Sequence, residues 1–99
     1  MSNAADPQKV AEADAKAKRK SRQEDEDLRV VMLSPEGRRT IWRILCSTGA
    51  RRSSFTGNSE TFFREGERNV GLRLQEHVER VAFDMFLLMQ KEAHQGESE

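Results

Sequence analysis

The sequence contains little of what usually stabilises a small domain. It has one cysteine, two prolines and no tyrosine, and hydrophobic residues make up 35% of its 99 residues, against roughly 45–50% in typical globular chains. The single cysteine, Cys46, excludes an internal disulfide and any zinc site built from several cysteines. Because Cys46 lies close to Trp42 and Ile44 in the sequence, we expect it to be a small packing residue.

Long apolar runs are also missing. No run of about 18 apolar residues is present, and the N-terminus lacks the apolar core of a signal peptide. We therefore expect neither a membrane-spanning segment nor classical secretion. A chain of this length buries only a small core, which argues against a self-contained enzyme and favours a module stabilised by a partner or by copies of itself.

Neither sign of charge is in excess, because 17 Lys+Arg residues balance 17 Asp+Glu residues. The chain as a whole is therefore not a general polyanion binder. Within the first 27 residues, however, the charges are segregated into a basic block and an acidic block. The basic block contains Lys16, Lys18, Arg19, Lys20 and Arg22. The acidic block that follows directly contains Glu24, Asp25, Glu26 and Asp27.

The first 27 residues are predicted to form a charged helical arm. Asp6 and Pro7 fit a helix N-cap and first helical position, and residues 8–33 contain neither glycine nor proline. No apolar stripe precedes Leu28, so we expect the arm to fray alone and to order against something else. It is either a solvated arm or a docking arm that presents its two charge blocks to a partner.

Three further helices are expected, and the sequence has no strand candidate, so the fold class is all-α. Ser34 and Pro35 can begin a helix that ends near Thr48, and Gly49 is a natural left-handed terminator. A helix capped by Asn58 or Ser59 should run to about residue 81, with a 3–4 spacing of core-facing residues. These residues are Phe63, Gly66, Val70, Leu74, His77, Val78 and Val81. A last, strongly apolar helix covers about residues 84–94, either separate from the previous one or joined to it by a kink near Ala82.

No catalytic arrangement is recognisable. The sequence has no phosphate-binding glycine loop, no HExxH and no GxSxG motif. We expect His77 to be a hydrogen-bonded structural residue rather than a base or a metal ligand. Glu60 with Arg64 and Glu76 with Arg80 have the spacing of exposed ion pairs along a helix. We therefore expect no enzyme activity, no metal and no cofactor.

Two kinds of interaction surface are predicted. Arg51 and Arg52 lie in a Ser-rich loop that could follow a phosphate backbone or contact a partner protein. The last helix is too apolar around its circumference to be solvated on all sides. Its predicted partner-binding residues are Phe83, Phe86, Leu87 and Met89.

The segment 55–74 is the most distinctive part of the chain. It follows the pattern F-x-G, then E-T-x-F, then E-G-x-R-x-x-G-x-x-L. The residues of this pattern include Phe55, Gly57, Glu60, Thr61, Phe63, Glu65, Gly66, Arg68 and Gly71. The segment resembles a family of small helical proteins encoded among the virion structural genes of short-tailed bacteriophages, and the likeness extends from about Leu28 to Lys91. Such proteins often have a proline before the last helix, where this chain has Ala82 and Phe83.

The resemblance implies a phage structural component, near the portal or the head–tail junction, with no established catalytic chemistry. We expect a charged arm over residues 1–27, a compact helical domain over 28–95 and a tail over 96–99. The expected partners are portal or neighbouring connector proteins and further copies of the chain, inside a virion assembled in the host cytoplasm. The alternative is a nucleic-acid-binding accessory factor in phage DNA packaging or regulation, which would use the basic block and Arg51-Arg52.

Overall fold

The computed structural model describes residues 6–50 and 59–98, with the backbone alone described for 59–63, 97 and 98. The described residues form four helices: α1 (Pro7–Leu33), α2 (Pro35–Ser47), α3 (Ser59–Val81) and α4 (Phe83–Ser98). No strand occurs in these two ranges. The predicted all-α class is confirmed for them.

The two helix starts expected from Asp-Pro and Ser-Pro pairs are both present. Asp6 caps α1 by accepting a hydrogen bond from the backbone N–H of Gln8 at 3.0 Å. Ser34 caps α2 by accepting one from Gly37 N–H at 2.9 Å, with Pro35 at the first helical position. Side-chain oxygens satisfy donors that have no partner inside the helix, so these sequence signals specify where the chain turns.

Helix α2 ends as expected. Thr48 is its C-cap, and Gly49 has φ of 78°, a left-handed conformation that side chains rarely adopt. The neighbouring prediction for Cys46 is wrong, because its side chain is exposed. On a helix the residue after a buried Leu45 points about 100° away from it, and here that direction faces solvent.

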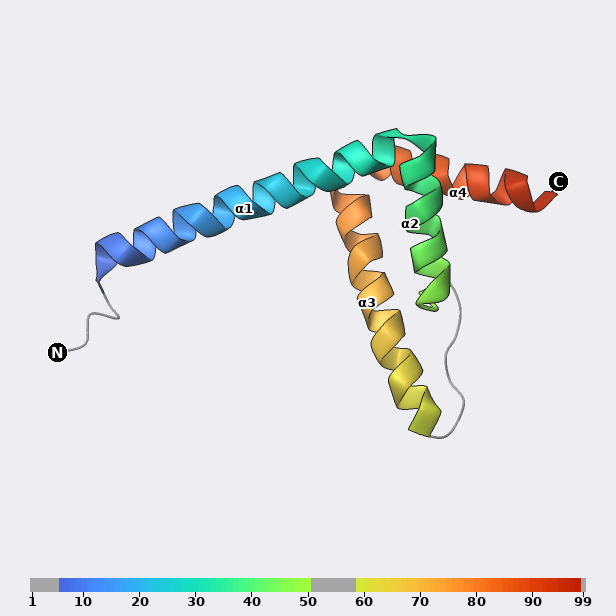
Figure 1. Ribbon diagram of the computed structural model, residues 1–99, viewed down its shortest axis with the longest axis horizontal. Coiled ribbons are helices and arrows are strands. Elements are labelled where there is room, and N and C mark those ends of the chain that lie inside the picture. The colour runs from blue at the N-terminus through green and yellow to red at the C-terminus, as the bar shows by residue number, and fades with distance from the viewer. Residues whose placement is uncertain (1–5, 51–58, 99) are drawn as a thin grey trace.

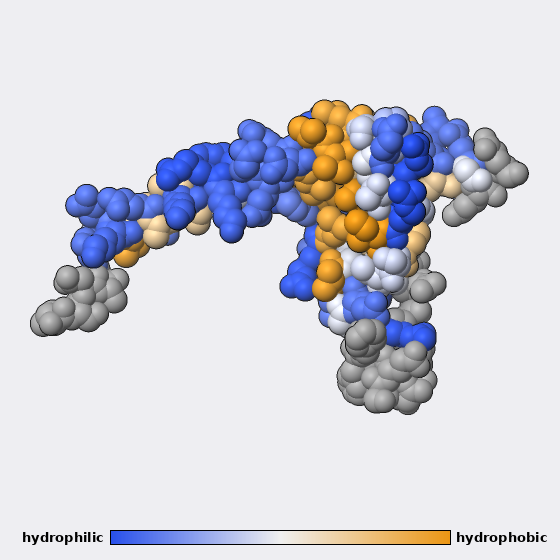
Figure 2. All heavy atoms as spheres, in the orientation of Figure 1, coloured by the Kyte–Doolittle hydropathy of each residue, from blue (hydrophilic) through white to orange (hydrophobic). Residues whose placement is uncertain are grey.

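All four helices contribute to one small core. Its buried members are Met32, Ile41, Leu45, Ala50, Val78, Ala82, Phe86 and Met89. Leu28 and Trp42 are among the partly buried residues that pack against it. In Figure 1, α2 and α3 lie antiparallel below the C-terminal end of α1, and α4 extends away from the arm. Figure 2 shows hydrophobic residues gathered where α1 meets α2, and hydrophilic residues along most of α1.

In its first half, helix α3 buries a different face from the one that was expected. Val70 is 52% exposed and Gly66 is exposed, whereas Gly71 is buried; Val78, in the second half of the helix, is buried as expected. A Cβ added at Gly71 would overlap the side chain of Thr48 and lie 2.9 Å from the Cβ of Ala50. Gly71 is therefore where α3 crosses the end of α2. A Cβ added at Gly66, by contrast, would meet nothing within 4 Å.

Helices α3 and α4 are separate, and no proline is needed at the bend. Ala82 lies between them, donating its N–H to Val78 O at 2.8 Å and accepting from Phe86 N–H at 2.8 Å. The side chain of Ala82 is buried. A small residue in the core thus ends one helix and begins the next, and Figure 1 shows the resulting change of direction.

The chain is extended rather than compact. Its Cα radius of gyration is 18.4 Å and its dimensions are 65 × 39 × 16 Å, whereas a compact domain of about 100 residues has a radius near ~13 Å. The predicted boundary at residue 28 falls inside α1, which is continuous from Pro7 to Leu33. At the other end, residues 96–98, assigned to a tail, belong to α4.

Candidate interaction surfaces

The C-terminal third of α1 is tied to α3 by a charged cluster around Asp25. Its carboxylate accepts hydrogen bonds from both terminal nitrogens of Arg80, each at 3.0 Å, and lies 2.8 Å from Nε2 of His77. These bonds, first those from Arg80 and then that from His77, lower the pKa of Asp25 from 3.8 to about 2. His77 is thus hydrogen-bonded, as expected, whereas Arg80 pairs across the fold with Asp25 rather than with Glu76.

A second link joins α1 to the bend between α3 and α4. Arg29 donates to Val81 O at 3.1 Å, where α3 leaves carbonyl groups without helical partners. The same guanidinium lies 3.5 Å from Asp84. The pKa of Asp84 is lowered mainly by the backbone N–H of Met85 and further by Arg29. Asp25 and Arg29 therefore mark where α1 joins the rest of the fold.

Residues 7–24 of α1 form a free arm, and we use that name for this segment below. Their side-chain hydrogen bonds stay within α1 or its cap, as in the bond from Gln8 to Glu12. Within residues 6–31, which the structure describes, no side chain belongs to the buried core. The five cations of the basic block are all exposed on this arm and have no ion-pair partner within 4 Å among the described residues.

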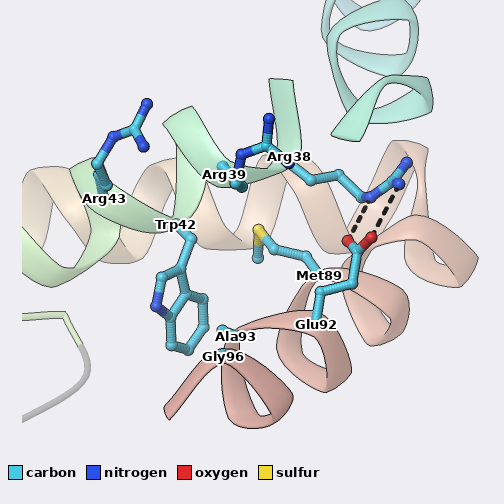
Figure 3. A pocket seen from close by; sticks show the side chains of 8 residues that line it. All are labelled: Arg38, Arg39, Trp42, Arg43, Met89, Glu92, Ala93 and Gly96. Carbon is cyan, nitrogen blue, oxygen red and sulfur yellow. Dashed lines mark hydrogen bonds and ion pairs between the residues drawn. The ribbon is translucent and has the colours of Figure 1, made fainter. Parts of the chain in front are cut away.

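A groove of about 430 Å³ lies between α2 and α4. Figure 3 shows the side chains that surround it. They are Arg38, Arg39, Trp42, Arg43, Met89, Glu92, Ala93 and Gly96. Arg39 and Arg43 are exposed on its α2 side, and Trp42 and Met89 supply apolar surface. The combination suits an apolar side chain flanked by carboxylates, as found on a protein surface.

The groove is built on an ion pair. Arg38 Nε donates to Glu92 at 2.6 Å, and a terminal nitrogen donates to the other carboxylate oxygen at 3.1 Å. Arg38 also donates to Met32 O at 3.0 Å, satisfying a carbonyl in the last turn of α1. The hydrogen bonds between the two side chains lower the pKa of Glu92 and raise the pKa of Arg38. Because Arg38 is already paired, it holds three helices together rather than offering its charge to a ligand.

The predicted partner surface of α4 is only partly exposed. Phe83 and Leu87 are 56% and 50% exposed. Phe86 and Met89 instead lie in the core, so their assignment as partner contacts is corrected. Phe86 and Met89 are three residues apart and share the face of α4 that packs inward, whereas Phe83 and Leu87, four residues apart, lie together on the neighbouring, exposed face. Val30 and Leu33 add exposed apolar surface on α1, at 66% and 55%.

The distinctive segment is described in part. Arg51, Arg52, Phe55 and Gly57 lie outside the described residues. Glu60, Thr61 and Phe63 are in the first turns of α3, where the backbone alone is described. Glu65, Gly66, Arg68 and Gly71 follow on α3; Glu65 and Arg68 are half-buried, and Gly71 contacts the end of α2.

Sequence reasoning missed the three pairings that assemble the fold: Asp25 with Arg80, Arg29 with Asp84 and Arg38 with Glu92. The two residues of each pair are 54 or 55 positions apart in the sequence. The only local signal was the helical spacing of His77 and Arg80, which puts both on one face of α3. In the described ranges, no three potential metal ligands cluster and no helix is long and apolar enough to span a membrane.

Comparison with known protein families gives a clear relationship. The model of a family described as Bbp19-like phage protein matches residues 28–88, which is 61 of the 99 residues. The chain therefore belongs to this family of phage proteins. The matched region begins at Leu28, so the expectation that the charged arm lies outside the family region is confirmed. No curated protein and no solved structure matches the chain.

Proposed function

We propose that the protein is a non-enzymatic structural or assembly component of the phage virion. It is a minor component near the portal or head–tail junction, and it acts by helix packing with neighbouring virion proteins and with copies of itself. The observation that carries the proposal is the free arm, a helical segment that has no side-chain hydrogen bond to the other helices. An isolated polar helix is marginal in water, so such an arm is best explained by a partner.

The surface of the molecule supports the same proposal. Its accessible area is 7440 Å², against roughly 5,800 Å² for a compact monomer of this mass. The surplus includes Phe83 and Leu87, which share one face of α4 at a spacing of four residues. Partly exposed aromatic and leucine side chains in a small domain provide the apolar centre of a protein–protein contact.

The proposal is tested by light scattering of the purified protein mixed with the portal protein of the same phage. We expect a complex larger than either component. The double variant Phe83→Glu/Leu87→Glu should lose at least about tenfold in affinity, because two charges would enter an apolar contact. Val70→Glu is the matched control, since Val70 is 52% exposed on another helix. Failure of the unaltered protein to bind portal would contradict placement at the junction.

The second candidate function is nucleic-acid binding in packaging or regulation. The observation in its favour is the exposure of all five cations of the basic block within one helical segment. Binding through several phosphates requires affinity for duplex DNA to fall by orders of magnitude between about 50 and 200 mM salt. Filter binding or fluorescence anisotropy at these two salt concentrations checks it, and weak, salt-independent binding would contradict it.

A further inference from the structure

Near Gln23, the charged residues of α1 are basic before it and acidic after it, at matching distances from that residue. Counting outward from it, Arg22 corresponds to Glu24, Lys20 to Glu26 and Arg19 to Asp27. All six residues are exposed on a continuous helix. In an antiparallel pair of identical helices related by a two-fold axis at Gln23, residues equally far from that axis lie at the same height. Each cation of one copy would then be level with a carboxylate of the other.

We propose that the arm docks on the α1 helix of a second copy of this chain, antiparallel, with the two-fold axis at Gln23. The partner of the arm is thus a second copy of the chain. This inference rests on the proposed function only in treating the arm as a docking segment. Such a contact is isologous: each copy contributes its basic block to the partner's acidic block and receives the same contact in return. The charges that lie most directly against the second copy are Arg19, Lys20 and Asp27, on the half of α1 that faces away from the fold.

The face of α1 that this pairing uses is open. Asp25, Arg29 and Met32 point toward the rest of the fold, through contacts with α3, the α3–α4 bend and the core. Gln23, Lys20 and Asp27 lie on the opposite side of the helix, because they are displaced by roughly 140–160° from Asp25 at 100° per residue, and Arg19 is displaced by roughly 120°. Arg22, three residues before Asp25, lies nearer the side that faces the fold. Figure 1 shows the arm extending well beyond the other three helices.

The same register also covers exposed apolar surface. Val30, 66% exposed, would lie level with Lys16 of the second copy, and Leu33, 55% exposed, level with Ala13. A lysine covers apolar surface with its methylene groups while its ammonium group remains in water. The overlap from residue 13 to residue 33 is about 30 Å long at 1.5 Å per residue. Helices α2, α3 and α4 of the two copies would lie at opposite ends of the paired α1 helices and on opposite sides of the pair.

Charge pairing within one helix is the competing explanation, since Lys20 with Glu24 and Arg22 with Glu26 have i,i+4 spacing. The structure forms neither pair within 4 Å. The two explanations differ in one respect: only pairing between copies can be restored by a second chain of opposite charge.

The test is a charge-exchange experiment on the full chain, by sedimentation velocity at about 50 mM salt. The first variant is Arg19→Glu/Lys20→Glu/Arg22→Glu, and the second is Glu24→Lys/Glu26→Lys/Asp27→Lys. Asp25 is left unchanged because it holds α1 to α3. The unaltered protein should sediment as a dimer of twice 11.4 kDa. Each variant alone should be monomeric, and their equimolar mixture should form a heterodimer.

Circular dichroism of each variant monitors its helix content, because Glu and Lys are both good helix formers. For the unaltered protein, raising salt to about 500 mM should weaken the dimer by roughly tenfold or more through screening of exposed pairs. Three outcomes would overturn the pairing: a monomeric unaltered protein, self-association of either reversal variant, or a mixture that stays monomeric. A monomer that still binds portal would overturn the pairing and leave the proposed contact with neighbouring virion proteins standing.

Discussion

At the scale of single residues, Arg38 is the one charged side chain buried in the described part of the fold, with 6% of its surface exposed. Its guanidinium joins three helices: it lies on α2, bonds Glu92 of α4 in two places and caps a carbonyl of α1. Burial of a charge is costly unless it is paired. The ion pair therefore offsets the cost of burying Arg38 where α4 packs against α2.

Glu92→Ala should lower the free energy of unfolding by about 2 kcal/mol, because it leaves the Arg38 charge without its main acceptor. The partial exposure of Glu92, 35%, keeps the loss below that of a fully buried pair. Glu36→Ala is the control, since its oxygen lies 3.9 Å from an exposed Arg39, and it should change stability by less than about 0.5 kcal/mol. Urea unfolding of both variants checks the difference, and equal losses would contradict this role for Arg38.

The Asp25 cluster predicts a specific dependence on pH. The pKa of Asp25 is lowered in the folded state, so its contribution is fully present above 3.8 and is lost as pH falls through about 2. The docking of α1 on α3 should therefore weaken between about pH 4 and pH 2. Asp25→Asn should show less of this acid dependence than the unaltered protein, measured as the urea midpoint against pH. Asp14→Asn, on the arm, should keep the dependence; an identical profile for Asp25→Asn would contradict the assignment.

At the scale of helices, local sequence signals predicted where helices begin and end better than they predicted which helix faces are in contact. Asp6, Ser34 and Gly49 act on their own neighbours in sequence, so their roles as caps and terminator could be read directly. The buried face of α3 could not, because it depends on where α2 ends against it. Likewise the sequence could not say which of Phe83, Phe86 and Leu87 face inward, since α4 is apolar on several sides.

The two described glycines inside α3 should respond in opposite ways to alanine. Gly71→Ala should lower stability by roughly 1–3 kcal/mol, because the added methyl overlaps Thr48 at the end of α2. Gly66→Ala should raise stability by up to about 1 kcal/mol through helix propensity, since its added methyl meets nothing within 4 Å. Thermal unfolding followed by circular dichroism measures both. A stabilising Gly71→Ala would contradict the close crossing of α3 and α2.

At the scale of the whole molecule, the composition predicted a chain that cannot cover all its apolar surface, and the extended shape agrees with that prediction. The relationship to phage proteins also follows from a sequence pattern, through the family match over residues 28–88. The docking of α1 was not predictable, because Asp25 is one of four adjacent carboxylates and only the fold selects it for Arg80. Residues 7–24, before Asp25, make no side-chain hydrogen bond to the other helices, and we propose that a partner stabilises them.

The central claim is that this protein belongs to the phage particle or to its assembly. Quantitative mass spectrometry of gradient-purified particles, including particles that have not yet packaged DNA, tests it most directly. We predict that the protein is present in one of these fractions in a fixed ratio to the portal protein. Its absence from every particle fraction, with abundant protein in the lysate, would contradict a structural or assembly role.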